Sequence, residues 1–189
     1  MISKLSTQIT QYAISHNIIQ PEEYNIYYFA FLSLIERILS WGFILLVGIM
    51  SRHSLGTFAF LCSFIPLRIY AGGFHARKYK SCFASSSIAF VLMILIYRFY
   101  FINMASPVLL SLLVASYIII WGLAPLEDKN KPLDTSEYSK YKKRTRVILS
   151  LESMIAIILL LSNTQRQISA FIVMGITMES ILLLLSPQK

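Results

Sequence analysis

RIYAGGFHARKYKSC, from Arg68 to Cys82, is a short polar break, with a pair of glycines, between two apolar segments of the chain. It carries His75 and Cys82, and the chain has only one other cysteine. The flanking segments, residues 55–70 and 81–101, approach the length of about 20 apolar residues that a helix needs to cross a bilayer. The pattern therefore predicts two membrane helices joined by a polar connection.

The composition of the whole chain is that of a membrane protein. Hydrophobic residues make up 56% of the 189 residues and charged residues only 14%, and the mean hydropathy is +0.64. A soluble domain usually carries about 25% charged residues. The net charge is +8, and the basic residues lie beside apolar segments, which favours contact with lipid headgroups over nucleic acid. We expect an all-α polytopic membrane protein that binds no nucleic acid.

About six membrane helices are predicted within a single integral membrane domain, residues 1–189, in which no internal repeat is visible. The predicted spans are residues 24–50, 55–70, 81–101, 107–123, 147–161 and 168–185. Residues 1–18 place Ile2, Leu5 and Tyr12 on one helical face and predict an amphipathic helix. Two interpretations of this helix stay open: it lies in the membrane interface, or it packs on the protein's own loops.

The basic residues predict the orientation in the membrane. The loops assigned to the outside hold only Arg52, Arg98 and Arg166, whereas most lysines and arginines lie in the segments on the other side. The positive-inside rule then places both termini and the His75–Cys82 segment in the cytoplasm. The longest polar insertion, residues 127–146, is a candidate for binding a partner or lipid.

His75 and Cys82 are the candidate catalytic pair, because a thiol nucleophile and an imidazole base are the minimum for cysteine-dependent acyl transfer. Arg68, His75 and Cys82 are seven residues apart, which on one straight helix would separate neighbours by about 10 Å. Gly72 and Gly73 permit the break in the helix that the pair requires. Arg68 either orients a substrate carboxylate or stabilises an oxyanion, and amides around Gly73 are further oxyanion donors.

The remaining cysteine and histidines do not predict a metal site. His53, His75 and Cys82 lack the clustered spacing of zinc ligands, so we expect no metal and no cofactor. Cys62 lies in the apolar stretch LCSFIPL and is interpreted as a small, core-facing residue.

Three glutamates fall within or beside the predicted spans. Carboxylates in a membrane are costly enough to suggest a role, which applies to Glu36, Glu152 and Glu179. We expect Glu36 and the adjacent Arg37 to form internal pairs in the helix bundle.

Arg68, the Gly72–Ala76 segment GGFHA and Cys82 resemble the signature of the AgrB family, the accessory gene regulator B membrane endopeptidases. The later stretch from Ala124-Pro125 to Leu133 resembles the family's loop between its fourth and fifth spans. The resemblance implies that Cys82 is the nucleophile, that His75 is its catalytic partner, and that Arg68 and Gly73 are needed for activity. It also implies an AgrD-like propeptide substrate, a cyclic thiolactone or lactone product for quorum sensing, a homodimer and a Gram-positive host.

Two other classes of function remain open. A membrane peptide transporter or export subunit fits the number of spans, although no repeat or paired half-helices support it. A membrane scaffold could recruit a partner through residues 127–146 without catalysing any reaction.

Overall fold

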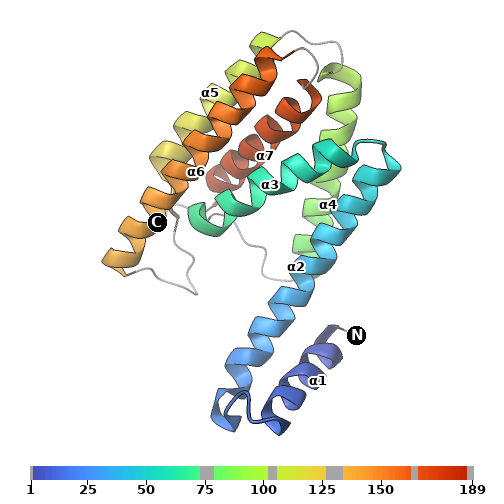
Figure 1. The fold of residues 1–189 in the computed structure, drawn as a ribbon, viewed down its shortest axis with the longest axis vertical. Coiled ribbons are helices and arrows are strands. Elements are labelled where there is room, and N and C mark those ends of the chain that lie inside the picture. The colour runs from blue at the N-terminus through green and yellow to red at the C-terminus, as the bar shows by residue number, and fades with distance from the viewer. Residues whose placement is uncertain (1, 73–78, 102–105, 127–133, 163–165, 187–189) are drawn as a thin grey trace. The chain divides into compact units, whose positions relative to one another are not determined.

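The computed structural model describes residues 2–72, 79–101, 106–126, 134–162 and 166–186, and over these it is all-α (Figure 1). Its elements are α1 (Ile2–Ser15), the 3₁₀ turn η1 (Pro21–Glu23), α2 (Tyr24–Met50), α3 (Ser54–Ala71), α4 (Tyr79–Ile96), the π-helical turn η2 (Tyr97–Phe101), α5 (Ser106–Leu123), α6 (Thr135–Leu161) and α7 (Arg166–Leu184). The helical stretches Pro21–Met50, Ser54–Ala71 and Arg166–Leu184 are long and apolar enough to cross a membrane, and Ser86–Phe99 and Pro107–Leu123 are shorter apolar helices. The prediction of an all-α membrane protein is confirmed.

Helix α6 is longer than the predicted span 147–161, because it begins at Thr135. Asp134 precedes it in an extended conformation, and its carboxylate accepts hydrogen bonds from the Thr135 amide at 2.8 Å and the Ser136 hydroxyl at 3.1 Å. These are the contacts of a helix N-cap, which satisfies amides that have no partner within the helix. Residues 135–146, which were interpreted as part of a polar loop, are therefore the charged first half of a helix.

The chain forms two compact units, Met1–Leu46 and Val47–Lys189. In the first unit, α1 packs on α2 through small side chains, because Ser6, Thr10 and Ala13 are buried and the Ser6 hydroxyl donates to the Tyr28 carbonyl at 2.7 Å. Leu5 and Tyr12 of α1 remain exposed. The structure supports the interpretation that α1 packs on the protein, although it packs on a helix and not on loops. The exposed apolar side chains of α1 also remain available to lipid.

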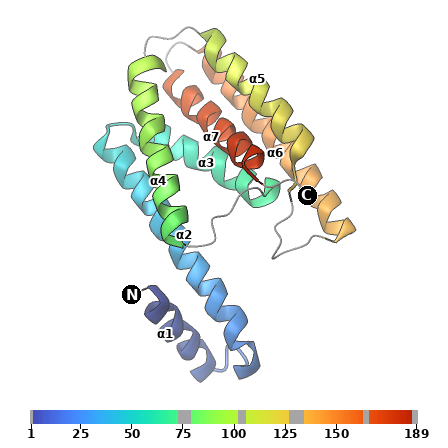
Figure 2. The same ribbon diagram turned by 180° about the vertical axis from the view of Figure 1, so that it is seen from behind.

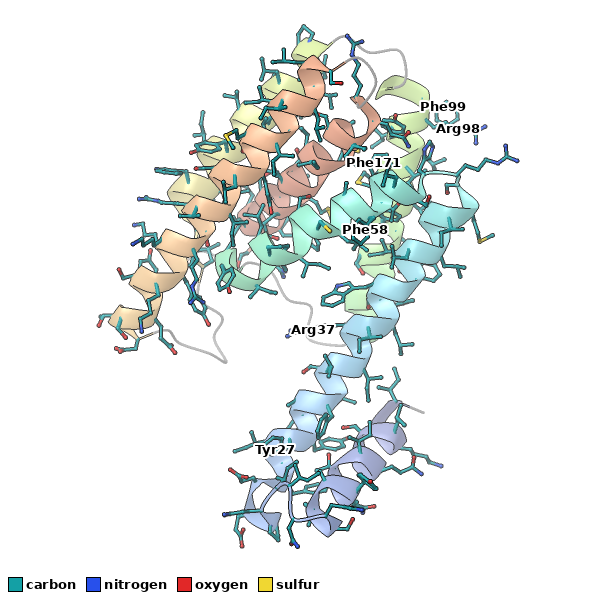
Figure 3. The ribbon with its side chains drawn as sticks, in the orientation of Figure 1. Tyr27, Arg37, Phe58, Arg98, Phe99 and Phe171 are labelled. Atoms are coloured by element: carbon teal, nitrogen blue, oxygen red, sulfur yellow. The ribbon has the colours of Figure 1, made fainter. Side chains whose placement is uncertain are left out.

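Glu36 and Arg37 do not form the pair that the sequence suggested. Both residues are described, and no ion pair joins them on α2, where Arg37 is exposed (Figure 3). A mutual pair is disfavoured because consecutive residues of a helix point about 100° apart, whereas residues three or four positions apart are the ones that meet. Pairing with other residues of the bundle stays a prediction.

In the second unit, α7 is the central helix, packed against α3, α5 and α6 (Figures 1 and 2). Every residue from Ala170 to Ile176 is buried. A β-carbon on Gly175 would overlap the Ser63 hydroxyl and lie 3.1 Å from the Phe60 carbonyl. Small residues of this kind let membrane helices approach closely, and here they bring α3 against α7.

An aromatic cluster joins the start of α3, the end of α4 and the start of α7. Phe171 of α7 is labelled in Figure 3. Its ring lies 5.9 Å from the His53 ring and 5.0 Å from the Tyr97 ring. Gln167 Nε2 forms a hydrogen bond with His53 Nδ1 at 2.7 Å. Aromatic pairs at these separations add to the burial of the rings. The cluster therefore holds the end of the α4–η2 segment on the central helix.

Candidate functional site

The candidate site begins where α3 ends, at Gly72. This residue has φ +78° and ψ −135°, in the region that favours glycine, and a β-carbon here would overlap the Leu126 carbonyl oxygen. Gly72 and Leu126 form a parallel bridge, and the Leu126 amide donates to the Ala71 carbonyl at 2.9 Å. The last turn of α3 is thus attached to the chain that follows α5.

Arg68 and Glu179 form an ion pair beside this junction. Arg68 Nη1 of α3 lies 3.7 Å from Glu179 Oε1 of α7, and it also donates a hydrogen bond to the Gly72 carbonyl. The Glu179 side chain is completely buried and that of Arg68 is 16% exposed. A carboxylate removed from water in this way is strongly destabilising unless a cation compensates it. Arg68 is that cation, and it links α7 to the carbonyl that ends α3.

The packing of α3 on α7 explains why these two residues meet. Contacts between the helices advance in the same direction along both, from His53 with Gln167, through Ser63 with Ile172, to Arg68 with Glu179. The helices therefore run parallel where they touch. The two helices approach closely near the middle of α3. In the last turn of α3, the longer side chain of Arg68 therefore reaches Glu179 on α7.

Of the predicted catalytic residues, only the backbone of Cys82 falls within the described part of the chain. Cys82 is the fourth residue of α4, in its first turn, where the sequence analysis placed it. A helix N-terminus favours the thiolate form of a cysteine. Gly73 and His75 lie outside the described residues, as does the Cys82 side chain. The segment that carries His75 starts directly after the anchored Gly72.

Cys62 does not face the core, contrary to the prediction. Its side chain is exposed on α3, whose buried positions are Gly56, Thr57, Phe60, Leu61, Ser63, Leu67 and Ala71. An apolar run in a soluble protein implies burial, but in a membrane helix an outward-facing residue meets hydrocarbon that is as apolar as the protein core. Cys62 is therefore not part of the buried face that carries Leu67 and Ala71.

The two remaining membrane glutamates differ in their partners. Glu179 was singled out from the sequence, but its partner Arg68 was not recognised, because nothing in the chain signals contact across 111 positions. Among the described residues, neither the buried Oε2 of Glu152 on α6 nor the two carboxylate oxygens of Glu179 have a hydrogen-bond partner, but Glu179 forms an ion pair and Glu152 forms none. Only Glu179 is therefore joined to a residue of the candidate site.

Comparison with known proteins identifies the family. The model of the AgrB family, accessory gene regulator B, matches residues 6–183. The chain belongs to the AgrB family. A protein of Clostridium perfringens (strain SM101 / Type A), named "Putative AgrB-like protein", is 26% identical over 164 residues, which cover 84% of this chain and 77% of the relative. A second, "Putative AgrB-like protein 2" of Clostridium perfringens (strain 13 / Type A), is 26% identical over 149 residues, 76% of this chain and 70% of the relative. No solved structure matches the chain.

Membership of the AgrB family implies a role in processing the peptide of an accessory gene regulator quorum-sensing system. It also implies a peptidase role, an AgrD-like propeptide as partner, and association with the membrane. The apolar helices of the structure agree with the membrane location.

Proposed function

We propose that this protein is a membrane-embedded cysteine endopeptidase that cleaves the C-terminal part of an AgrD-like propeptide and promotes its cyclisation. The observation that carries the proposal is the family match over residues 6–183, which includes the whole Arg68–Cys82 segment. The first-turn position of Cys82 on α4 supports it, because a nucleophilic thiol needs an environment that favours the thiolate.

The chemistry follows from the pair of groups. The Cys82 thiolate attacks the scissile carbonyl, the peptide C–N bond breaks, and the His75 imidazolium gives its proton to the leaving amine. The product is a thioester between the propeptide and Cys82. The thiol or hydroxyl of a cysteine or serine within the propeptide then gives its proton to His75 and attacks that thioester, which breaks the bond to Cys82, releases the Cys82 thiolate and closes a thiolactone or lactone ring. The site must hold this internal nucleophile close to the thioester and limit water, since hydrolysis competes with ring closure.

We assign Arg68 a positioning role in place of direct contact with a substrate carboxylate. Its guanidinium already binds Glu179 and the Gly72 carbonyl, so both partners lie within the protein. By holding the end of α3 on α7, Arg68 sets the point from which the Gly73–His75 segment departs. Gly73 remains a proposed source of oxyanion-stabilising amides.

The arrangement in the membrane is proposed on the distribution of charge. Both termini and the catalytic segment are cytoplasmic, because the predicted outer loops hold few basic residues. We also propose that residues 1–189 act as one integral membrane domain, because apolar segments of near-spanning length recur along the chain. We further propose a homodimer, which the family resemblance implies. We also propose a Gram-positive host, which is consistent with the Clostridium relatives.

Cleavage of a synthetic propeptide by the purified protein in liposomes tests the function. Cys82→Ala should abolish cleavage while the amount of protein in the membrane stays unchanged. Cys62→Ala is the matched control and should retain cleavage, because Cys62 is exposed on α3. Normal processing by Cys82→Ala would end the proposal, and loss of processing in Cys62→Ala alone would reverse the assignment of the two cysteines.

A further inference from the structure

A hollow of about 520 Å³ lies between α5 and α6. Three cations of α6 line it, Lys142, Lys143 and Arg146. The rest of the wall is formed by Trp121 of α5 and by four residues of α6, two apolar and two polar: Val147, Leu151, Ser139 and Ser150. The hollow, which we call the α5–α6 groove, therefore combines positive charge with an apolar surface.

The three cations line the same side of α6, and no carboxylate within the described ranges is paired with them. Arg146 lies four positions after Lys142 and three after Lys143, so each lysine is a neighbour of Arg146 on the surface of α6, within about one helical turn. None of the carboxylates that the structure describes forms an ion pair with them. The Arg146 guanidinium lies 4.4 Å over the Trp121 ring, and its Nε is buried without a hydrogen-bond partner among the described residues. The groove thus presents an oriented guanidinium and two ammonium groups to an anion.

The groove lies at the border between charged and apolar surface. The α5 and α6 helices run antiparallel here, because Tyr117 contacts Ser150 at 3.2 Å and Trp121 contacts Arg146. On α6 the charged half ends at Arg146 and an apolar half follows. Tryptophan is enriched at the level of lipid headgroups, so Trp121 marks the same depth on α5. Exposed apolar side chains continue from the groove toward the membrane centre: Ile118, Leu151, Met154, Ile155 and Ile158.

We propose that the α5–α6 groove binds one anionic phospholipid. Its phosphodiester accepts charge-assisted hydrogen bonds from Lys142, Lys143 and Arg146, and its acyl chains lie along the apolar surface below. Three cations within one helical turn suit a single phosphate better than an extended acidic peptide. An acidic peptide would also leave the apolar strip uncovered, whereas a lipid covers both parts. The proposal does not depend on the protease assignment.

Tryptophan fluorescence can report on this groove directly, because the chain has only two tryptophans, Trp41 and Trp121. The full-length Trp41→Phe variant, placed in phosphatidylcholine vesicles, leaves Trp121 as the sole emitter. A small fraction of phosphatidylglycerol with brominated acyl chains is then compared with the same fraction of brominated phosphatidylcholine. We expect brominated phosphatidylglycerol to quench Trp121 with an apparent affinity at least roughly tenfold higher, since each basic residue near an anionic surface contributes about a factor of five.

Matched pairs of substitutions separate a site from general surface charge. In the Trp41→Phe background, Lys142→Gln with Lys143→Gln should remove most of the preference for phosphatidylglycerol. Lys140→Gln with Arg144→Gln removes the same charge from α6 outside the groove and should keep the preference, because Arg144 lies over the Tyr70 ring. Equal quenching by the two brominated lipids, or equal loss in the two double variants, would overturn the proposal. Recovery of Trp121 emission on adding a micromolar glutamate-rich peptide would assign the groove to an acidic peptide and also overturn it.

Discussion

The Arg68–Glu179 junction and the α5–α6 groove use basic residues in opposite ways. At the junction, one guanidinium is largely buried and compensates a completely buried carboxylate on another helix. In the groove, three cations are gathered on one helix face with no described carboxylate paired to them. A paired buried charge determines how helices are held together, whereas an unpaired surface charge is available to a ligand. The location and partner of each cation, more than its residue type, therefore indicate its role.

The largest expected effect is from breaking the buried pair. Glu179→Gln keeps the shape of the side chain but leaves Arg68 without its carboxylate, and loss of one partner of a buried pair costs about 3–5 kcal/mol. We expect the free energy of unfolding in detergent to fall by about that amount and propeptide cleavage to fall with it.

Glu152→Gln is the matched control for that variant, because it also removes a carboxylate from a membrane helix but orphans no arginine in the described chain. Its stability and cleavage should stay close to those of the wild type. Glu179→Asp should recover part of the cleavage, since it restores the charge. Equal losses in Glu179→Gln and Glu152→Gln would mean that the pairing with Arg68 has no special role.

Gly72→Ala should have the next largest effect. The substitution places a β-carbon on a residue with positive φ and against the Leu126 carbonyl, and strain of this kind costs on the order of 1–3 kcal/mol. We expect a lower unfolding temperature and slower propeptide cleavage. Gly122→Ala is the control within the same compact unit, because nothing lies within 4 Å of its added β-carbon. Wild-type cleavage by Gly72→Ala would show that the end of α3 need not be held in this conformation.

Added salt should have a smaller effect than these substitutions, and it should act on the α5–α6 groove more than on the Arg68–Glu179 junction. Raising ionic strength from about 0.1 M to 1 M shortens the Debye length from about 10 Å to about 3 Å, which screens exposed charges more than buried ones. The preference of the groove for phosphatidylglycerol should therefore weaken several-fold, while the stability difference between wild type and Glu179→Gln stays nearly constant. If salt reduced that stability difference as much as it reduced the lipid preference, the Arg68–Glu179 pair would not be shielded from solvent.

The smallest expected effect is at the start of α6, before the groove. Hydrogen bonds from the Thr135 amide and the Ser136 hydroxyl hold the pKa of Asp134 below its usual value. A carboxylate with a lowered pKa in the folded state stabilises that state above its unfolded pKa of about 4, and the contribution is lost as the pH falls through the folded value. Asp134→Ala should speed amide exchange in the first turn of α6 at neutral pH, whereas Asp134→Asn should retain the cap. Unchanged exchange in Asp134→Ala would show that the cap does not hold this turn.

Much of the fold was predictable because its signals are local. Long apolar runs predicted apolar helices, and paired glycines predicted the end of α3. Cys82 was expected near the start of a helix, and it lies in the first turn of α4. Each inference needs only the solubility of neighbouring residues in hydrocarbon or the conformational range of glycine, so the sequence by itself was sufficient.

The tertiary structure alone decided which side chains face one another. It paired Arg68 with Glu179, turned Cys62 outward, set Gly72 against Leu126, and brought Trp121 beside Arg146. Hydrophobic periodicity locates the buried face of a soluble helix, but a membrane helix is apolar toward both lipid and protein, so that signal is lost. The buried faces are then chosen by close packing of small residues such as Gly175 on neighbouring helices, which no single segment of sequence contains.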